Sequence, residues 1–142
     1  AGGVLLLMGN DIGNSEFDHF NQLATNFGIV FNKDSKGRVV GNQFEMGKAM
    51  VPVDNEIFKT AKQLYIKEYS TLKLSAPAKA VFKDKDGNNM MAVAKFGKGT
   101  VFAIGDPWLY DEYVNGRKLP TVYDNFNAGQ DLIYWISKQL KK

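Results

Sequence analysis

Two runs of apolar residues, each of strand length and each followed by glycine, constrain the fold of this chain most strongly. The first run is Gly3–Met8 before Gly9, and the second is Thr100–Ile104 before Gly105. A strand that is covered on both faces shows such a continuous apolar pattern, whereas a strand with one solvated face alternates. Both runs therefore predict central strands of a parallel sheet. The first run is much shorter than the roughly 20 residues of a membrane span, so no span is expected.

The segment after the first run predicts a helix and a second strand. Ser15 stands where a helix cap is expected, and the acidic residues Glu16 and Asp18 suit the first turn. Apolar residues at helical spacing continue as far as Gly28, which suits a helix end, and Ile29–Phe31 follows as a short strand. A strand, a capped helix and a strand in close succession are typical of a βαβ unit.

The second half of the chain predicts a β-hairpin and a closing helix. Ala80–Phe82 and Met90–Phe96 flank a polar turn, and Gly97–Gly99 forms a tight turn into the second apolar run. The closing helix is predicted over residues 124–140. Its predicted buried stripe consists of Phe126, Leu132, Ile133, Ile136 and Leu140. These elements together predict a single α/β domain with a β-hairpin insertion.

Composition removes several kinds of chemistry. The chain has 142 residues with no cysteine and one histidine, His19, so we expect no disulfide, no thiolate or multi-histidine metal site and no cysteine nucleophile. The glycine-rich motifs of dinucleotide and P-loop nucleotide sites are absent, so no cofactor is expected. The net charge of +3 comes from scattered basic residues, which argues against a nucleic-acid partner.

Polar loops follow both apolar runs, over residues 9–14 and 105–113. In an open α/β sheet, ligands bind beyond the carboxyl ends of the strands, where such loops meet. Aromatic rings can stack on sugar C–H faces while carboxylates and amides bind hydroxyl groups, and an arginine can bind a uronate carboxylate. The candidate ligand-binding residues are Asn10, Asp11, Asp106, Trp108, Tyr110 and Arg117.

Three further interpretations of the same residues stay open. Asp106 before Pro107 fits a turn cap as well as a ligand site. Asp11 and Asp106 could instead serve a carboxylate-based hydrolase or sugar-modifying enzyme, which needs two carboxyl groups about 5–10 Å apart. A third hypothesis is a protein-interaction module, for which an exposed apolar patch would be the mark.

The segment Phe96–Asp106, an aromatic-Gly-Lys-Gly turn followed by an apolar strand and Gly-Asp, resembles class I glutamine amidotransferase-like domains of the non-catalytic, trehalose-utilisation type. This resemblance implies a flavodoxin-like three-layer α/β sandwich with a mainly parallel sheet. Working amidotransferases use a Cys-His-Glu triad. Because this chain has no cysteine, the resemblance implies that the domain is not an enzyme of that kind.

A narrower resemblance is to the carboxy-terminal accessory domain of Bacteroidetes unsaturated rhamnogalacturonyl hydrolases. The segments that carry it are Leu6–Asp11, Gly41–Glu45 and Gly105–Tyr113 with its continuation over 116–120. It implies that residues 1–142 are one accessory domain cut from a longer protein, in a periplasmic or secreted location. The implied role is non-catalytic: packing on a catalytic domain of the same polypeptide, or binding an oligosaccharide.

Overall fold

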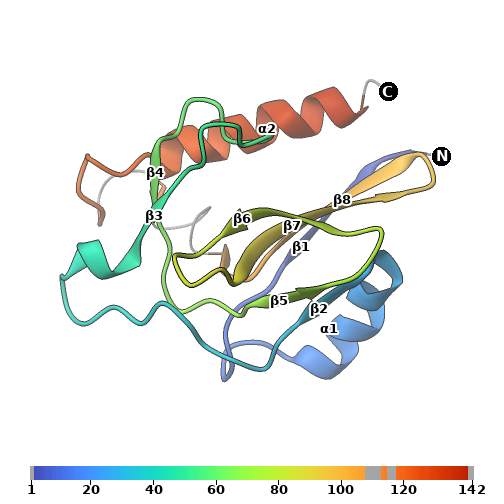
Figure 1. Cartoon of the computed structure of the whole chain (residues 1–142), viewed down its shortest axis with the longest axis horizontal. Helices are drawn as coiled ribbons and strands as arrows, with labels where there is room; N and C mark the ends of the chain where they lie inside the picture. Colours follow the sequence, from blue (N-terminus) through green and yellow to red (C-terminus); the bar gives the residue numbers. More distant parts are fainter. Residues whose placement is uncertain (1, 108–112, 115–117, 141–142) are drawn as a thin grey trace.

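The computed structural model describes residues 2–107, 113–114 and 118–140, and it is built on a six-stranded mixed sheet with helices on both sides (Figure 1). The strand order is β1-β8-β7-β5-β2, and β6 also pairs with β7. These strands are β1 (Val4–Met8), β2 (Ile29–Phe31), β5 (Leu72–Leu74), β6 (Lys79–Lys83), β7 (Asn89–Phe96) and β8 (Gly99–Ile104). A separate two-stranded sheet consists of β3 (Lys48–Met50) and β4 (Gln63–Tyr65). The helices are α1 (Phe17–Ala24) and α2 (Asn125–Leu140), with short 3-10 turns η1 (Thr25–Phe27) and η2 (Phe44–Gly47).

The sheet is not mainly parallel, so the prediction of a flavodoxin-like sandwich is wrong. Among the strands of the described residues only β1 and β8 pair in parallel, and the other pairs are antiparallel. The predicted βαβ unit is wrong for the same reason. The position next to β1 is taken by β8, and β2 instead pairs antiparallel with β5, Ile29 opposite Leu74. A strand–helix–strand succession sets the order of elements in the chain but not the neighbour that each strand chooses.

The first apolar run forms an edge strand rather than a central one. In β1, Leu7 is 2% exposed, but Leu5, Leu6 and Met8 are 36%, 37% and 39% exposed. The second run is the buried strand that its pattern predicts, because residues 101–104 of β8 are all at most 2% exposed. A continuous apolar run is therefore compatible both with a buried strand and with an edge strand that leaves apolar side chains on the surface.

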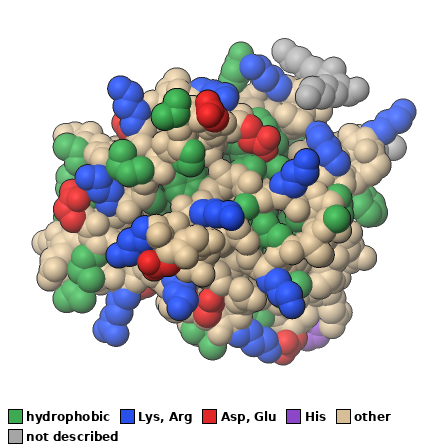
Figure 2. All heavy atoms as spheres, viewed as in Figure 1, with side chains coloured by type: hydrophobic (Ala, Val, Ile, Leu, Met, Phe, Trp, Pro, Cys, Tyr) green, Lys and Arg blue, Asp and Glu red, His purple; other side chains and the backbone are tan. Residues whose placement is uncertain are grey.

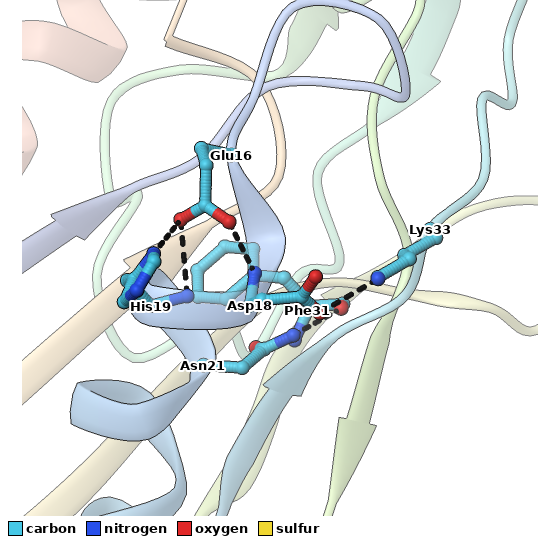
Figure 3. Close-up of polar contacts among 6 residues, drawn as sticks. All are labelled: Glu16, Asp18, His19, Asn21, Phe31 and Lys33. Atoms are coloured by element: carbon cyan, nitrogen blue, oxygen red, sulfur yellow. Dashed lines mark hydrogen bonds and ion pairs between the residues drawn. The ribbon is translucent and has the colours of Figure 1, made fainter.

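Helix α1 begins as predicted near residue 16, but Glu16 caps it instead of Ser15 (Figure 3). The Glu16 carboxylate accepts hydrogen bonds from the backbone N–H groups of Asp18 and His19, each at 3.0 Å. The hydrogen bond from His19 is the largest cause that lowers the pKa of Glu16. The Ser15 hydroxyl is used elsewhere, since it accepts the N–H of Asn10 at 2.7 Å.

The Asn21 side chain of α1 forms hydrogen bonds to the backbone of β2 of the kind that a neighbouring strand would form. Asn21 accepts the N–H of Phe31 at 2.8 Å and donates to the Phe31 carbonyl at 2.9 Å (Figure 3). This two-way bond satisfies the backbone of the last residue of β2. An exposed ion pair between Lys33 and Asp18, at 2.6 Å, lies beside it.

The core has one large cluster on each face of the main sheet. On the α1 face, Leu7 and Ala103 pack with Phe17. On the α2 face, Phe102 and Ile104 pack with Leu132 and with residues around β4. Each face of β8 is therefore covered by apolar side chains, which is why its sequence does not alternate.

Helix α2 confirms the predicted closing helix, but its buried stripe is rotated from the predicted one. Leu132 is 2% exposed, whereas Phe126, Ile133 and Leu140 are 55%, 64% and 62% exposed. The fully buried positions are Asn125, Ala128, Asp131 and Leu132. Their spacing is helical, but two of the four side chains are polar, and a search for apolar periodicity therefore misses them.

The Asp131 carboxylate holds α2 against the segment before β4. One of its oxygens accepts the backbone N–H groups of Lys59, Thr60 and Ala61 at 2.8, 2.8 and 3.1 Å, and the other accepts the Thr60 hydroxyl at 3.0 Å. Asn125 adds a two-way bond to the backbone of Tyr65, at 2.8 and 3.0 Å. These polar contacts, made by side chains at most 7% exposed, determine which side of α2 faces the core.

We predict that Asp131→Ala lowers the free energy of unfolding by about 3 kcal/mol, because it removes the shared acceptor of three backbone N–H groups, of which that of Ala61 is buried. Urea denaturation measures the change. Asp54→Ala is the matched control, since Asp54 is exposed and its side chain makes no hydrogen bond to the described residues. A loss no larger than that of the control would show that Asp131 does not anchor α2.

We also predict that Gly105→Ala destabilises the fold by about 1–3 kcal/mol, because the added Cβ would lie 1.9 Å from the backbone carbonyl oxygen of Ser70 and the chain must shift. Gly3→Ala is the control, since its Cβ meets nothing within 4 Å. Thermal unfolding of the two variants compares them. Equal melting temperatures would contradict the close approach of Gly105 to Ser70.

Candidate functional site

An apolar groove lies between helix α2 and strand β1, around a hollow of about 660 Å³. The described residues that line it carry no charged side chain. They are Leu6, Met8, Val114, Phe126, Gly129, Gln130, Leu132, Ile133, Tyr134 and Ser137. We refer to this surface as the α2–β1 groove.

The α2–β1 groove follows directly from the fold. Successive side chains of a strand point to opposite faces, so Leu6 and Met8 point toward α2 while Leu7 enters the core below α1. The rotation of α2 that buries Asp131 turns Ile133 and Tyr134 outward, and they are 64% and 60% exposed. Two elements that are distant in the sequence thus contribute their unburied apolar side chains to one surface.

A cation borders this apolar surface. The Lys138 ammonium group lies 4.2 Å from the centre of the Tyr134 ring, close enough for a cation–π contact. Lys138 itself is not part of the groove lining. An apolar centre with polar groups at its border is typical of surfaces through which proteins bind one another.

The apolar run in the closing helix indicates from the sequence that this helix exposes apolar side chains. Residues 132–136 are five consecutive apolar residues, Leu-Ile-Tyr-Trp-Ile, within a helix. Because successive helical residues are about 100° apart, four of them surround the helix. A helix that packs by one side only must therefore leave some of them in solvent, which is the case for Ile133 and Tyr134.

Asn10 and Asp11, two of the predicted ligand-binding residues, lie in the loop after β1. Their side chains form hydrogen bonds to that loop and to Ser35. The Asn10 side chain accepts the N–H of Asp11 at 2.8 Å. Asp11 is 7% exposed, and its two carboxylate oxygens accept the Asn14 amide and the Ser35 hydroxyl, each at 2.7 Å. Both oxygens of Asp11 therefore already have donors from the protein.

Asp106 is fully buried, at 0% exposed, and accepts the backbone N–H of Lys67 at 3.3 Å. It thus links the end of β8 to the segment between β4 and β5. The other three candidates, Trp108, Tyr110 and Arg117, lie outside the described residues. That the six residues bind a ligand stays a prediction.

His19 is exposed, and its Nδ1 lies 3.2 Å from the carboxylate of Glu16. The described residues contain no group of three or more His, Cys, Asp or Glu that could hold a metal ion. No helix within the described residues is both long and apolar enough to cross a membrane.

An aromatic cluster at the end of β4 was not predicted. The Tyr65 ring lies 5.1 Å from that of Tyr113, 5.5 Å from that of Phe44 and 5.7 Å from that of Tyr123, between centroids. Burial is the largest cause that raises the pKa of Tyr65 to about 12. These rings come from four separate segments, so no local sequence pattern brings them together.

No protein-family model matches this chain, and no curated protein matches it. Among solved structures, the fold is similar to a chain titled "mmIFT52 N-terminal domain", with a TM-score of 0.73 and 22% sequence identity. The match covers 96% of this chain and 65% of that chain, so this chain spans less than two thirds of that structure's length. The fold resembles that domain.

This likeness and the mixed, mostly antiparallel sheet overturn the resemblance to amidotransferase-like and rhamnogalacturonyl hydrolase accessory domains. The segment Phe96–Asp106 that suggested it has local structural reasons for its glycines. Gly97 turns the chain at a φ of 55°, and Gly105 allows the close approach of Ser70. The turn and the close approach explain these two glycines without reference to that family.

The inferences that rested on that resemblance are corrected with it. The role as an accessory domain of a rhamnogalacturonyl hydrolase is not supported, and neither is a periplasmic or secreted location. Both had no basis other than the resemblance. The fold is instead similar to a domain of an intraflagellar transport protein.

Proposed function

We propose that this domain is a protein-interaction module, and that the α2–β1 groove is the surface through which it binds its partner. The observation that carries the proposal is the exposure of large apolar side chains from two elements around one hollow. Ile133 and Phe126 of α2 are 64% and 55% exposed, and Leu6 and Met8 of β1 are 37% and 39% exposed. Contiguous apolar surface of this kind favours a protein partner.

The proposed partner is an extended segment that adds a strand to β1. The backbone bonds at both ends of β1, Thr100 N–H to the Gly3 carbonyl and Gly9 N–H to the Ile104 carbonyl, place residues 3 and 9 against β8. By alternation along the strand, the N–H groups of Leu6 and Met8 point toward the other edge of β1, which no strand of the described residues covers. An added strand would bond to them, and its alternate side chains would enter the groove.

The absence of charged side chains from the described groove lining specifies the partner further. Burying a charge against an apolar surface costs more free energy than burying an apolar side chain gains. The inward side chains of the bound strand are therefore apolar, such as valine, isoleucine or phenylalanine. The similarity in fold to a domain of an intraflagellar transport protein supports a role in a protein complex.

We also propose that the domain has no catalytic activity of its own. A carboxylate pair that acts as acid and base needs oxygens that reach a substrate. Both oxygens of Asp11 accept hydrogen bonds from the protein, and Asp106 is fully buried. The chain also lacks the cysteine that a thiol nucleophile requires.

Selection from a display library of random short peptides tests the proposed interaction. We expect the selected peptides to share alternating apolar residues, and Ile133→Asp to weaken their binding at least about tenfold, because it places a charge in the groove. Leu140→Asp is the matched control. Leu140 is 62% exposed on the same helix but does not line the groove, and we expect its variant to bind as the wild type does.

Both substitutions replace exposed side chains, so we expect each to change the free energy of unfolding by no more than about 0.5 kcal/mol. Urea denaturation checks that the variants are folded. Failure to select any peptide, or selected peptides that bind Ile133→Asp as tightly as the wild type, would refute the groove as the binding surface.

A further inference from the structure

A second hollow, distinct from the α2–β1 groove, is bordered by positive charge. It has a volume of about 560 Å³ and lies between residues 36–38, strand β3 and the turn from β6 to β7. Five basic side chains and two carboxylates line it. The basic ones are Lys36, Arg38, Lys48, Lys83 and Lys85. Figure 2 shows Lys and Arg side chains spread over this face of the molecule, with hydrophobic side chains visible between them.

The carboxylates of Asp84 and Asp86 offset only part of the positive charge of this basic hollow, because five basic side chains line it. Lys36, Arg38, Lys83 and Lys85 form no ion pair with a described residue, and Lys48 has only an exposed pair with Glu45 at 3.4 Å.

The carboxylate of Asp84 accepts hydrogen bonds within the turn from β6 to β7. Its oxygens accept the backbone N–H groups of Asp86 and Asn88, the Asn88 amide and the Tyr69 hydroxyl, the last at 2.7 Å. Burial raises the pKa of Asp84, but the hydrogen bonds from Asn88 and Tyr69 outweigh it and hold the pKa below its ordinary value. Asp84 therefore stays charged, and its oxygens accept hydrogen bonds from the turn and from Tyr69.

Apolar side chains lie among these cations. Met46 and Met50 line the basic hollow and are 48% and 60% exposed, and Ile66 and Met90 lie buried in its wall. Methionine side chains adapt their shape to different apolar groups. A ligand that fits this surface has apolar as well as negatively charged groups.

The edge of β3 that faces away from β4 is paired with no strand of the described residues, and it borders the hollow. The bonds from Ile66 N–H to the Gly47 carbonyl and from Val51 N–H to the Lys62 carbonyl show that residues 47 and 51 bond toward β4. By alternation, the N–H and carbonyl groups of Met50 point away from β4. The consecutive residues 48–50 all line the hollow, which is what the edge of a strand presents, whereas a face would present every second residue.

We propose that the basic hollow binds an acidic, extended peptide segment of a partner protein, which pairs with the free edge of β3 and places its carboxylates beside Lys36, Arg38, Lys83 and Lys85. Its apolar side chains contact Met46 and Met50. The charges steer the segment and fix its register, and the strand pairing supplies backbone bonds. This surface is separate from the α2–β1 groove, so either proposal can fail without the other.

A peptide fits this surface better than a nucleic acid does. Single-stranded nucleic acids are bound by exposed aromatic rings that stack on the bases. The one aromatic side chain among the described lining residues, Tyr69, is 5% exposed and donates its hydroxyl to Asp84. No ring is therefore presented to a base, whereas a free strand edge suits a polypeptide backbone.

The test uses fluorescence anisotropy with a labelled short peptide of alternating glutamate and valine, at low ionic strength. We expect it to bind at least about tenfold more tightly than the same peptide with glutamine in place of glutamate, and to weaken as salt is added. We further expect the amide hydrogen of Met50 to exchange more slowly in the complex than in the free protein. Oligothymidylate of similar length is the competing probe.

The double variant Lys83→Glu/Lys85→Glu is expected to lose at least about tenfold in peptide affinity. Its matched control is Lys73→Glu/Lys98→Glu, which changes the net charge equally at two exposed lysines outside the hollow and should bind nearly as the wild type does. Thermal unfolding confirms that both are folded.

Several outcomes would overturn the proposal. They are equal binding of the glutamine peptide, equal losses in the two double variants, and tighter binding of oligothymidylate than of the acidic peptide. Unchanged exchange of the Met50 amide in the complex would refute the pairing with β3.

Discussion

The hydrogen bonds that three backbone N–H groups donate to the Asp131 carboxylate determine which apolar side chains of α2 this domain exposes. Asp131 accepts them from residues 59–61, and Asn125, six residues earlier on α2, both accepts from and donates to the backbone of Tyr65. A buried carboxylate that satisfies several donors is costly to displace, so these contacts hold α2 in one rotation about its axis. That rotation buries Leu132 and leaves Ile133 in solvent. The apolar groove is thus a consequence of polar anchoring.

The position of β1 at the edge of the sheet likewise leaves apolar side chains exposed. Within the part of the chain that the structure describes, β1 pairs with β8 on one side and with no strand on the other, and it exposes apolar side chains next to α2. Long exposed apolar edges favour unwanted pairing unless a partner covers them. At a different place, β3 has a free edge bordered by lysines, and charge there both discourages self-pairing and suits an acidic segment. The two surfaces therefore select chemically different partners.

Most elements were predictable from local patterns, but their arrangement was not. The hairpin of β6 and β7, the buried strand β8 and helix α2 follow from periodicity and glycine positions, and the structure confirms them. The pairing of β2 with β5 was missed because three-residue strands carry too little pattern to specify a neighbour. The buried side of α2 was missed because Asn125 and Asp131 decide it, and their partners lie 60 or more residues away in the chain. At the predicted polar site, the partners of Asp11 and Asp106 likewise depend on tertiary structure.

Amide hydrogen exchange along β1 tests the central claim, that an apolar edge strand lies open beside α2, most directly. Residues 3 and 9 bond to β8, so the N–H groups of Leu5 and Leu7 point toward β8 and those of Leu6 and Met8 toward the open edge. We therefore expect slow exchange at Leu5 and Leu7 and much faster exchange at Leu6 and Met8 in the free domain. Equally slow exchange at all four amides would mean that β1 is paired on both sides, and it would contradict the account.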